Sequence, residues 1–149
     1  MLKTGVAITL RNDNNADVQV AFPAGTILKS RSGKLQNGIL VKKTTFLIPK
    51  NSQKRVHLFM YCGNYSRHAS SPSEIYDWSV ITTSRSLHNL FDLLIDKKIN
   101  IEQYLSSRSE IEKYANIVNK IQSIIWQITD WEHGLTESDK KYLEALPIE

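Results

Sequence analysis

The most reactive side chain of this sequence is Cys62, the only cysteine among 149 residues. A single cysteine excludes an internal disulfide framework and cannot supply a zinc-binding cluster. The nucleophilic form of cysteine is the thiolate, so a base must take the proton of a thiol whose ordinary pKa is about 8.5. Any thiol chemistry of this protein must therefore use Cys62 together with a group that accepts its proton.

Two histidines lie near Cys62 in the sequence and are the candidate bases. His57 belongs to the same predicted strand at an odd offset, so alternation places its ring on the opposite face of the sheet. His68 follows Cys62 by six residues, in a predicted loop that could fold back toward the sulfur. We therefore expect His68 to be the base if Cys62 reacts.

The second candidate side chain is Gln122, which lies in the strongest helical pattern of the sequence, residues 110–128. At about 100° per residue, Gln122 falls about 40° beyond Val118, at the border of an apolar stripe. Trp126 follows by one helical turn, so its indole should cover the same face. We therefore expect Gln122 to be partly buried and shielded by an aromatic ring. The stripe consists of Tyr114, Ile117, Val118, Ile121, Ile124, Ile125 and Ile128.

Residues 121–130, IQSIIWQITD, resemble the glutamine motif of bacterial thioester domains, in which Thr-Gln-x-Ala is followed by Ile-Trp and then Thr. In that family, the side-chain carbonyl of the glutamine is joined to the sulfur of an upstream cysteine that follows an aromatic residue. Cys62 follows Tyr61 and fits that position. Two residues depart from the motif: Ile121 replaces the threonine and Ile124 replaces the alanine.

The resemblance implies a thioester between Cys62 and Gln122, shielded by Tyr61 and Trp126. Such a bond is a stored electrophile that captures an amine or hydroxyl of a target protein and needs no cofactor. It acts in a single capture event and not in repeated turnover. Members of the wider group include surface adhesins, and relatives without secretion signals resemble parts of intracellular bacterial defence systems. This chain resembles the latter, so a defence role is expected.

Two other functions fit the same residues. In a non-reactive interaction module, Cys62 is a small buried core residue and Gln122 is a polar group at a helix edge. In a cysteine hydrolase or transamidase, Cys62 would act with His68, although no motif places an Asp or Asn to orient the histidine. The intact mass of the chain separates the thioester domain from both alternatives, because formation of the bond releases one ammonia.

The charges of the chain are unevenly distributed. Residues 1–60 hold ten Lys and Arg against two Asp and Glu, a net charge of +8, and residues 61–149 hold nine against thirteen, a net charge of −4, which together make +4. Lysines at strand edges also prevent pairing with other chains. Because the sequence contains no nucleic-acid-binding motif, we interpret the basic residues as solvated strand edges and do not expect a nucleic acid partner.

The sequence contains no segment that predicts export or membrane insertion. Its first residues lead into a polar stretch without the apolar core of a signal peptide, and no later apolar run is long enough to cross a bilayer. We therefore expect a cytoplasmic protein without a membrane partner.

The elements that must position the candidate side chains fall into two parts of one domain, residues 1–149. Short alternating runs separated by turn residues predict strands in residues 1–65, as an antiparallel sandwich or small barrel. Helical periodicity predicts a helical part in residues 85–146. The sequence therefore predicts an α+β fold, in which the helix of residues 110–128 packs across the strand that ends at Cys62.

Overall fold

The fold was analysed in a computed structural model, which describes residues 4–149. The strands precede the helices in the chain, as the sequence predicts, and the α+β fold class is confirmed. In chain order the elements are β1 (Thr4–Asn12), β2 (Val18–Phe22), β3 (Thr26–Ser30), β4 (Gly38–Ile39), β5 (Thr44–Ile48), β6 (Ser52–Cys62), β7 (Tyr76–Ile81), α1 (Arg85–Leu94), the 3-10 helix η1 (Ile101–Tyr104), α2 (Arg108–Thr129) and α3 (Glu137–Glu144).

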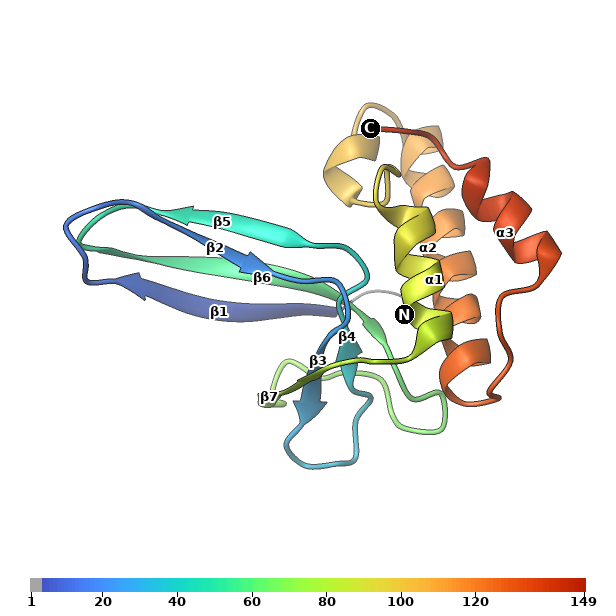
Figure 1. The fold of residues 1–149 in the computed structure, drawn as a ribbon, viewed down its shortest axis with the longest axis horizontal. Coiled ribbons are helices and arrows are strands. Elements are labelled where there is room, and N and C mark those ends of the chain that lie inside the picture. The colour runs from blue at the N-terminus through green and yellow to red at the C-terminus, as the bar shows by residue number, and fades with distance from the viewer. Residues whose placement is uncertain (1–3) are drawn as a thin grey trace.

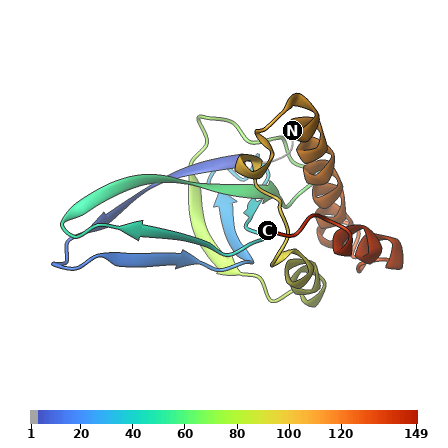
Figure 2. The same ribbon diagram turned by 90° about the horizontal axis from the view of Figure 1, so that it is seen from above.

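The strands form two antiparallel sheets, and the larger one is curled into a half-barrel. Its strand order is β1-β6-β4-β3-β7, while β2 and β5 form a separate pair. The helices gather at one end of the strands (Figure 1), and the longer strands extend away from them when the molecule is seen from above (Figure 2). The sequence patterns do not predict β7, which pairs antiparallel with β3 and forms one edge of this sheet.

The long strand β6 contributes to two hydrophobic clusters because its side chains alternate between the faces of the sheet. Leu58 and Met60 belong to a small cluster inside the half-barrel. Tyr61 points the other way and belongs to the larger cluster under the helices. His57 and Phe59, on the same face as Tyr61, are exposed. The helical part therefore covers only the last residues of β6, where Cys62 lies.

Helix α2 provides the main contact between the helical part and β6. It begins after Ser107, whose side chain accepts a hydrogen bond from the backbone N–H of Glu110, as an N-cap residue does. The predicted apolar stripe is buried from Ile117 to Ile128, and this stripe is what holds the helix against the sheet. None of the helices in residues 4–149 combines the length and the hydrophobicity that crossing a bilayer requires.

The short helix α3 is fixed by a buried carboxylate at its start. Thr136 and Asp139 form a capping box at its start. Asp139 also accepts hydrogen bonds from Lys120 and Gln127 of α2. Burial by itself raises the pKa of Asp139, but the hydrogen bonds from Thr136, Lys120 and Gln127 outweigh it, so the net pKa is lowered. Asp139 thus joins α3 to α2 as an ionised group.

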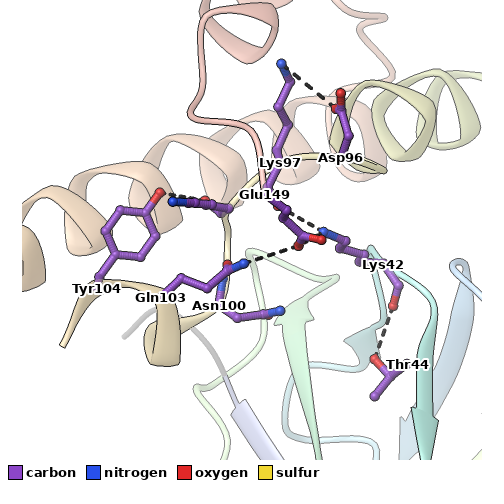
Figure 3. Close-up of polar contacts among 9 residues, drawn as sticks. Lys42, Thr44, Asp96, Lys97, Asn100, Gln103, Tyr104 and Glu149 are labelled. Carbon is purple, nitrogen blue, oxygen red and sulfur yellow. Dashed lines mark hydrogen bonds and ion pairs between the residues drawn. The ribbon is translucent and has the colours of Figure 1, made fainter. Parts of the chain in front are cut away.

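The last residues of the chain join the helical part to the sheet (Figure 3). The carboxylate of Glu149 accepts hydrogen bonds from Lys42, which follows β4, and from Gln103 of η1. The hydrogen bond from Lys42 is the main reason why the pKa of Glu149 is lowered. The Nζ of Lys42 also donates to the backbone oxygen of Lys97 (2.9 Å). Lys42 is therefore a cation shared by the C-terminus and the turn after α1.

Candidate functional site

The structure brings Cys62 and Gln122 together where α2 crosses the end of β6. Both are almost fully buried, with 4% and 1% of their surface exposed. The backbone N–H of Cys62 donates to Oε1 of Gln122 (2.8 Å), and Nε2 of Gln122 donates to the backbone oxygen of Cys62 (2.7 Å). Two hydrogen bonds to a single residue fix both the position and the orientation of the side-chain amide.

The amide of Gln122 lies at the edge of β6 that faces away from β4. The N–H of Gly63 donates to the backbone oxygen of Asn37 (2.8 Å), on the β4 side. Neighbouring residues of an antiparallel strand direct their backbone groups to opposite edges, so the N–H and C=O of Cys62 point away from β4. The described part of β1 pairs with this edge only as far as Met60. Gln122 therefore continues the ladder beyond the pairing with β1.

This pairing gives Gln122 a structural role. A buried backbone N–H or C=O without a partner costs about 1–3 kcal/mol. Gln122 satisfies one donor and one acceptor of Cys62 at once. The N–H of Cys62 is also directed at the oxygen on which negative charge would develop during attack on the Gln122 carbonyl, the position of an oxyanion-stabilising donor.

The sulfur of Cys62 leaves the sheet on the face of Met60, toward the inside of the half-barrel. Gly38 lies directly opposite Cys62 on β4, and a Cβ at Gly38 would meet the side chain of Met60. Gly38 thus leaves room for the side chain of Met60. The pKa of Tyr76 is raised, first by burial and then by the charge of Cys62, which places this phenol near the thiol. Tyr61, a predicted shield, lies on the opposite face of β6, under the helices.

A row of side chains along α2 contacts the segment that follows Cys62. One turn after Gln122, the indole N–H of Trp126 donates to Oε1 of Gln36 (3.2 Å), and its ring meets that of Tyr65 edge-on at 4.9 Å between centroids. One turn further, Oδ2 of Asp130 accepts a hydrogen bond from the backbone N–H of Tyr65 (2.8 Å). The row at positions i, i+4 and i+8 therefore holds both Cys62 and the loop after it.

Sequence reasoning missed two residues of this arrangement, Gln36 and Tyr65. Gln36 is buried, and its Nε2 donates to the backbone oxygen of Arg67 (3.2 Å). Its own backbone oxygen accepts a hydrogen bond from the hydroxyl of Tyr76 (3.3 Å). No local pattern marks Gln36, because its partners come from distant segments. Tyr65 has a weak signal, since an aromatic residue shortly after a reactive cysteine can pack over the same site.

His68, the predicted base, lies at the surface. Its backbone N–H donates to the backbone oxygen of Lys34 (3.2 Å), and its backbone oxygen accepts a hydrogen bond from the backbone N–H of Gln36 (2.9 Å). This segment therefore runs beside residues 34–36. The side chain of His68 is exposed, whereas Cys62 is buried. Its role as a base stays a prediction.

Neither family models, curated proteins nor solved structures gave a match to this chain. Within residues 4–149, no group of three or more His, Cys, Asp or Glu side chains could hold a metal ion. The candidate site therefore rests on the geometry around Cys62 and Gln122 and on the resemblance of residues 121–130 to the thioester motif.

Proposed function

We propose that this protein forms an internal thioester between Cys62 and Gln122 and uses it to capture a nucleophilic side chain of a target protein. The observation that carries the proposal is the buried pairing of the Gln122 amide with the backbone of Cys62 at 2.8 and 2.7 Å. It holds the electrophilic carbon beside the residue that carries the thiol. Fixed proximity of this kind contributes on the order of 7–11 kcal/mol to a reaction between two groups.

The orientation of the amide also supports the proposal. The Gln122 amide pairs with β6 as a neighbouring strand would, so its plane lies near that of the sheet. The Cα–Cβ bond of Cys62 leaves this plane, and rotation about it carries the sulfur toward the face of the Gln122 carbonyl. A nucleophile attacks a carbonyl from its face, and a thiol in that rotamer would have this approach.

Formation of the thioester releases one ammonia, and capture of the target releases the thiol. The Cys62 sulfur bonds to the side-chain carbon of Gln122, and the negative charge on Oε1 is stabilised by the Cys62 N–H. The C–N bond then breaks, and the nitrogen leaves as ammonia with the proton of the thiol. Later, an amine or hydroxyl of the target attacks the same carbon, the C–S bond breaks, and the sulfur takes up the proton of the nucleophile. The target remains joined to Gln122 through an amide or ester.

A target needs a path to this buried bond, and a cleft of about 430 Å³ lies next to the site. Its walls include Gly63 and Asn64, which follow Cys62, and Thr129 at the end of α2. A side chain entering this cleft would reach Gly63 and Asn64, directly after Cys62. Neither Cys62 nor Gln122 lines the cleft, so we propose it as an approach to the site and not as an opening onto the bond.

The same two hydrogen bonds favour a second candidate function, a non-reactive interaction module. In that case Gln122 remains an amide and serves only to satisfy the buried backbone of Cys62, beyond the described pairing with β1. Cys62 is then a small core residue. The two functions share one fold and differ in a single covalent bond.

The intact mass of the purified protein, measured with and without methylamine, tests the proposal. We expect a mass lower than the encoded mass by one ammonia, and addition of one methylamine at Gln122 after treatment. Cys62→Ala should have its full encoded mass and should not react. Gln53→Glu, at an exposed glutamine of β6, is the matched control and should still react.

A full encoded mass together with an unmodified Gln122 in peptide mapping would refute the thioester and leave the interaction module. A gain of one mass unit at position 122 has a different meaning. It indicates glutamate left by hydrolysis of a bond that had formed, and therefore supports the proposal.

A further inference from the structure

The C-terminal end of α2 carries negative charge without a cation to balance it. The backbone dipoles of a helix give its C-terminus a partial negative charge, and cationic side chains are favourable there. The last turn of α2 contains no basic residue, its C-cap is Asp130, and Glu132 follows two residues later. None of the ion pairs among residues 4–149 includes Asp130 or Glu132. This end of the helix is therefore complementary to a positively charged group.

The carboxylate of Glu132 belongs to the cleft of about 430 Å³ beside the loop after Cys62. Glu132 is the one ionisable residue that lines this cleft, and its other lining residues are apolar or uncharged. Apolar walls are supplied by Ile27, Ile39, Leu87 and Ile128. A cleft with apolar walls and a single carboxylate is suited to a cation at the end of an aliphatic side chain.

Two exposed aromatic rings lie next to the same cleft. Tyr65 follows the lining residue Asn64, and Trp131 precedes Glu132. The two rings contact each other at 5.3 Å between centroids with a tilt of 48°, yet 56% of Tyr65 and 52% of Trp131 are exposed. The faces of aromatic rings attract cations, and arginine uses them most often. Exposed rings and carboxylates therefore meet at one end of α2.

The basic residues nearest in the sequence do not neutralise this surface. Arg67 and His133 do not line the cleft, and neither takes part in the ion pairs among residues 4–149. The backbone oxygen of Arg67 accepts a hydrogen bond from Gln36 (3.2 Å), so its segment turns toward residues 34–36. The complementary cation must come from another molecule.

We propose that the end of α2 binds an arginine side chain of a partner protein. The guanidinium pairs with Glu132 and stacks on the exposed rings of Tyr65 and Trp131, while its aliphatic stem lies along the apolar wall of the cleft. Arginine fits better than lysine, because a planar guanidinium stacks on a ring and bonds a carboxylate at the same time. This binding goes beyond the thioester and does not require it, since neither Cys62 nor Gln122 lines the cleft.

Titration of the isotope-labelled full chain with Nα-acetyl-arginine methylamide, followed by amide chemical shifts, tests the proposal. This probe has no free amine that a thioester could capture. We expect it to bind about tenfold more tightly than its citrulline counterpart, which has nearly the same shape without the charge. The shifts should lie in residues 63–65 and 128–132. Cys62→Ala should bind the probe equally well, so the outcome does not depend on the thioester.

Glu132→Gln should remove the preference for arginine over citrulline. Glu112→Gln is the matched control, since it removes the same charge from an exposed residue near the other end of α2. Trp131→Leu should weaken binding severalfold, whereas Trp78→Leu, at a tryptophan of similar exposure on β7, should not.

Absence of binding, equal affinity for the arginine and citrulline probes, or equal effects of Glu132→Gln and Glu112→Gln would overturn the proposal. A further outcome concerns the choice of arginine. If Nα-acetyl-lysine methylamide bound Cys62→Ala as tightly as the arginine probe, stacking of a guanidinium would not be the basis of recognition, and the proposal would fail.

Discussion

The side-chain amide of Gln122 has one observed role and one proposed role. It completes the backbone pairing of Cys62, and it presents a polarised carbonyl beside the thiol of the same residue. Both tasks require burial, because hydrogen bonds and partial charges are strongest away from water. The identity of residue 122 therefore matters for stability whether or not the thioester forms.

In the amide form, Gln122→Ala should lower the free energy of unfolding by about 2–5 kcal/mol, because it removes the Gln122 hydrogen bonds to a buried N–H and C=O of Cys62 and removes core volume. Urea denaturation measures this change. Cys62→Ala also prevents the thioester but keeps the backbone groups and their partner, so it should cost clearly less. Ser123→Ala, at an exposed position of α2, should change stability by less than about 0.5 kcal/mol. If Gln122→Ala were as mild as Ser123→Ala, the backbone pairing would not exist in solution.

At the scale of elements, α2 makes contacts with the sheet part at intervals of one helical turn. Gln122, Trp126 and Asp130 reach, in order, Cys62, the ring of Tyr65 and the backbone of Tyr65. The same stretch of α2 also contacts α3, because Asp139 accepts hydrogen bonds from Lys120 and Gln127. The orientation of α2 therefore rests on polar contacts from both neighbours.

Asp139 should make the stability of this attachment pH-dependent. Its pKa is lowered in the folded protein, so its contribution is present above the unfolded value of about 3.9 and is lost as the pH falls below it. Asp139→Asn should cost about 1–2 kcal/mol near pH 7.

The difference between Asp139→Asn and the unmodified protein should shrink between about pH 5 and pH 3, as thermal or urea unfolding at several pH values can measure. A difference that stays constant over this range would show that the ionised form of Asp139 is not the stabilising one. Glu137→Gln, at an exposed position in the same turn, is the matched control for the loss of one charge.

At the scale of the whole molecule, the chain closes on itself at the interface between sheet and helices. Residues 147–149 run beside residues 96–98, where Lys98 donates to Pro147 (2.8 Å) and Glu149 donates to Asp96 (2.9 Å) through their backbones. The side chain of Glu149 then reaches Lys42. This segment adds polar contacts between the helical part and the sheet to those that Gln122, Trp126 and Asp130 make.

Deletion of residues 147–149 should lower the free energy of unfolding by about 2–3 kcal/mol, because two backbone hydrogen bonds and an ion pair are lost together. Glu149→Gln removes only the ion pair, whose carboxylate is 43% exposed, and should cost less than about 1 kcal/mol. Differential scanning calorimetry of the two variants separates the contributions. Equal losses would mean that the backbone pairing of this segment adds nothing.

The sequence by itself determined most of the secondary structure, apart from β7, and the pair of candidate residues, because those signals are local. Alternation predicts β6 and helical periodicity predicts α2, and both elements carry the side chains that drive their own packing. The resemblance of residues 121–130 to a known motif singled out Gln122 and, through it, Cys62. The crossing of α2 over the end of β6 was implied by that resemblance, and α2 contacts β6 in the structure.

Only the tertiary structure decided how the two residues meet. The direction of the Cys62 backbone groups depends on which neighbour pairs with β6 at that position, and this pairing is set by β4 and by the start of β1. The contacts of Gln36 and the strand β7 likewise depend on segments far away in the chain. Pairing between distant segments leaves no periodic trace in a single sequence, so the strand order of the half-barrel became visible only in three dimensions.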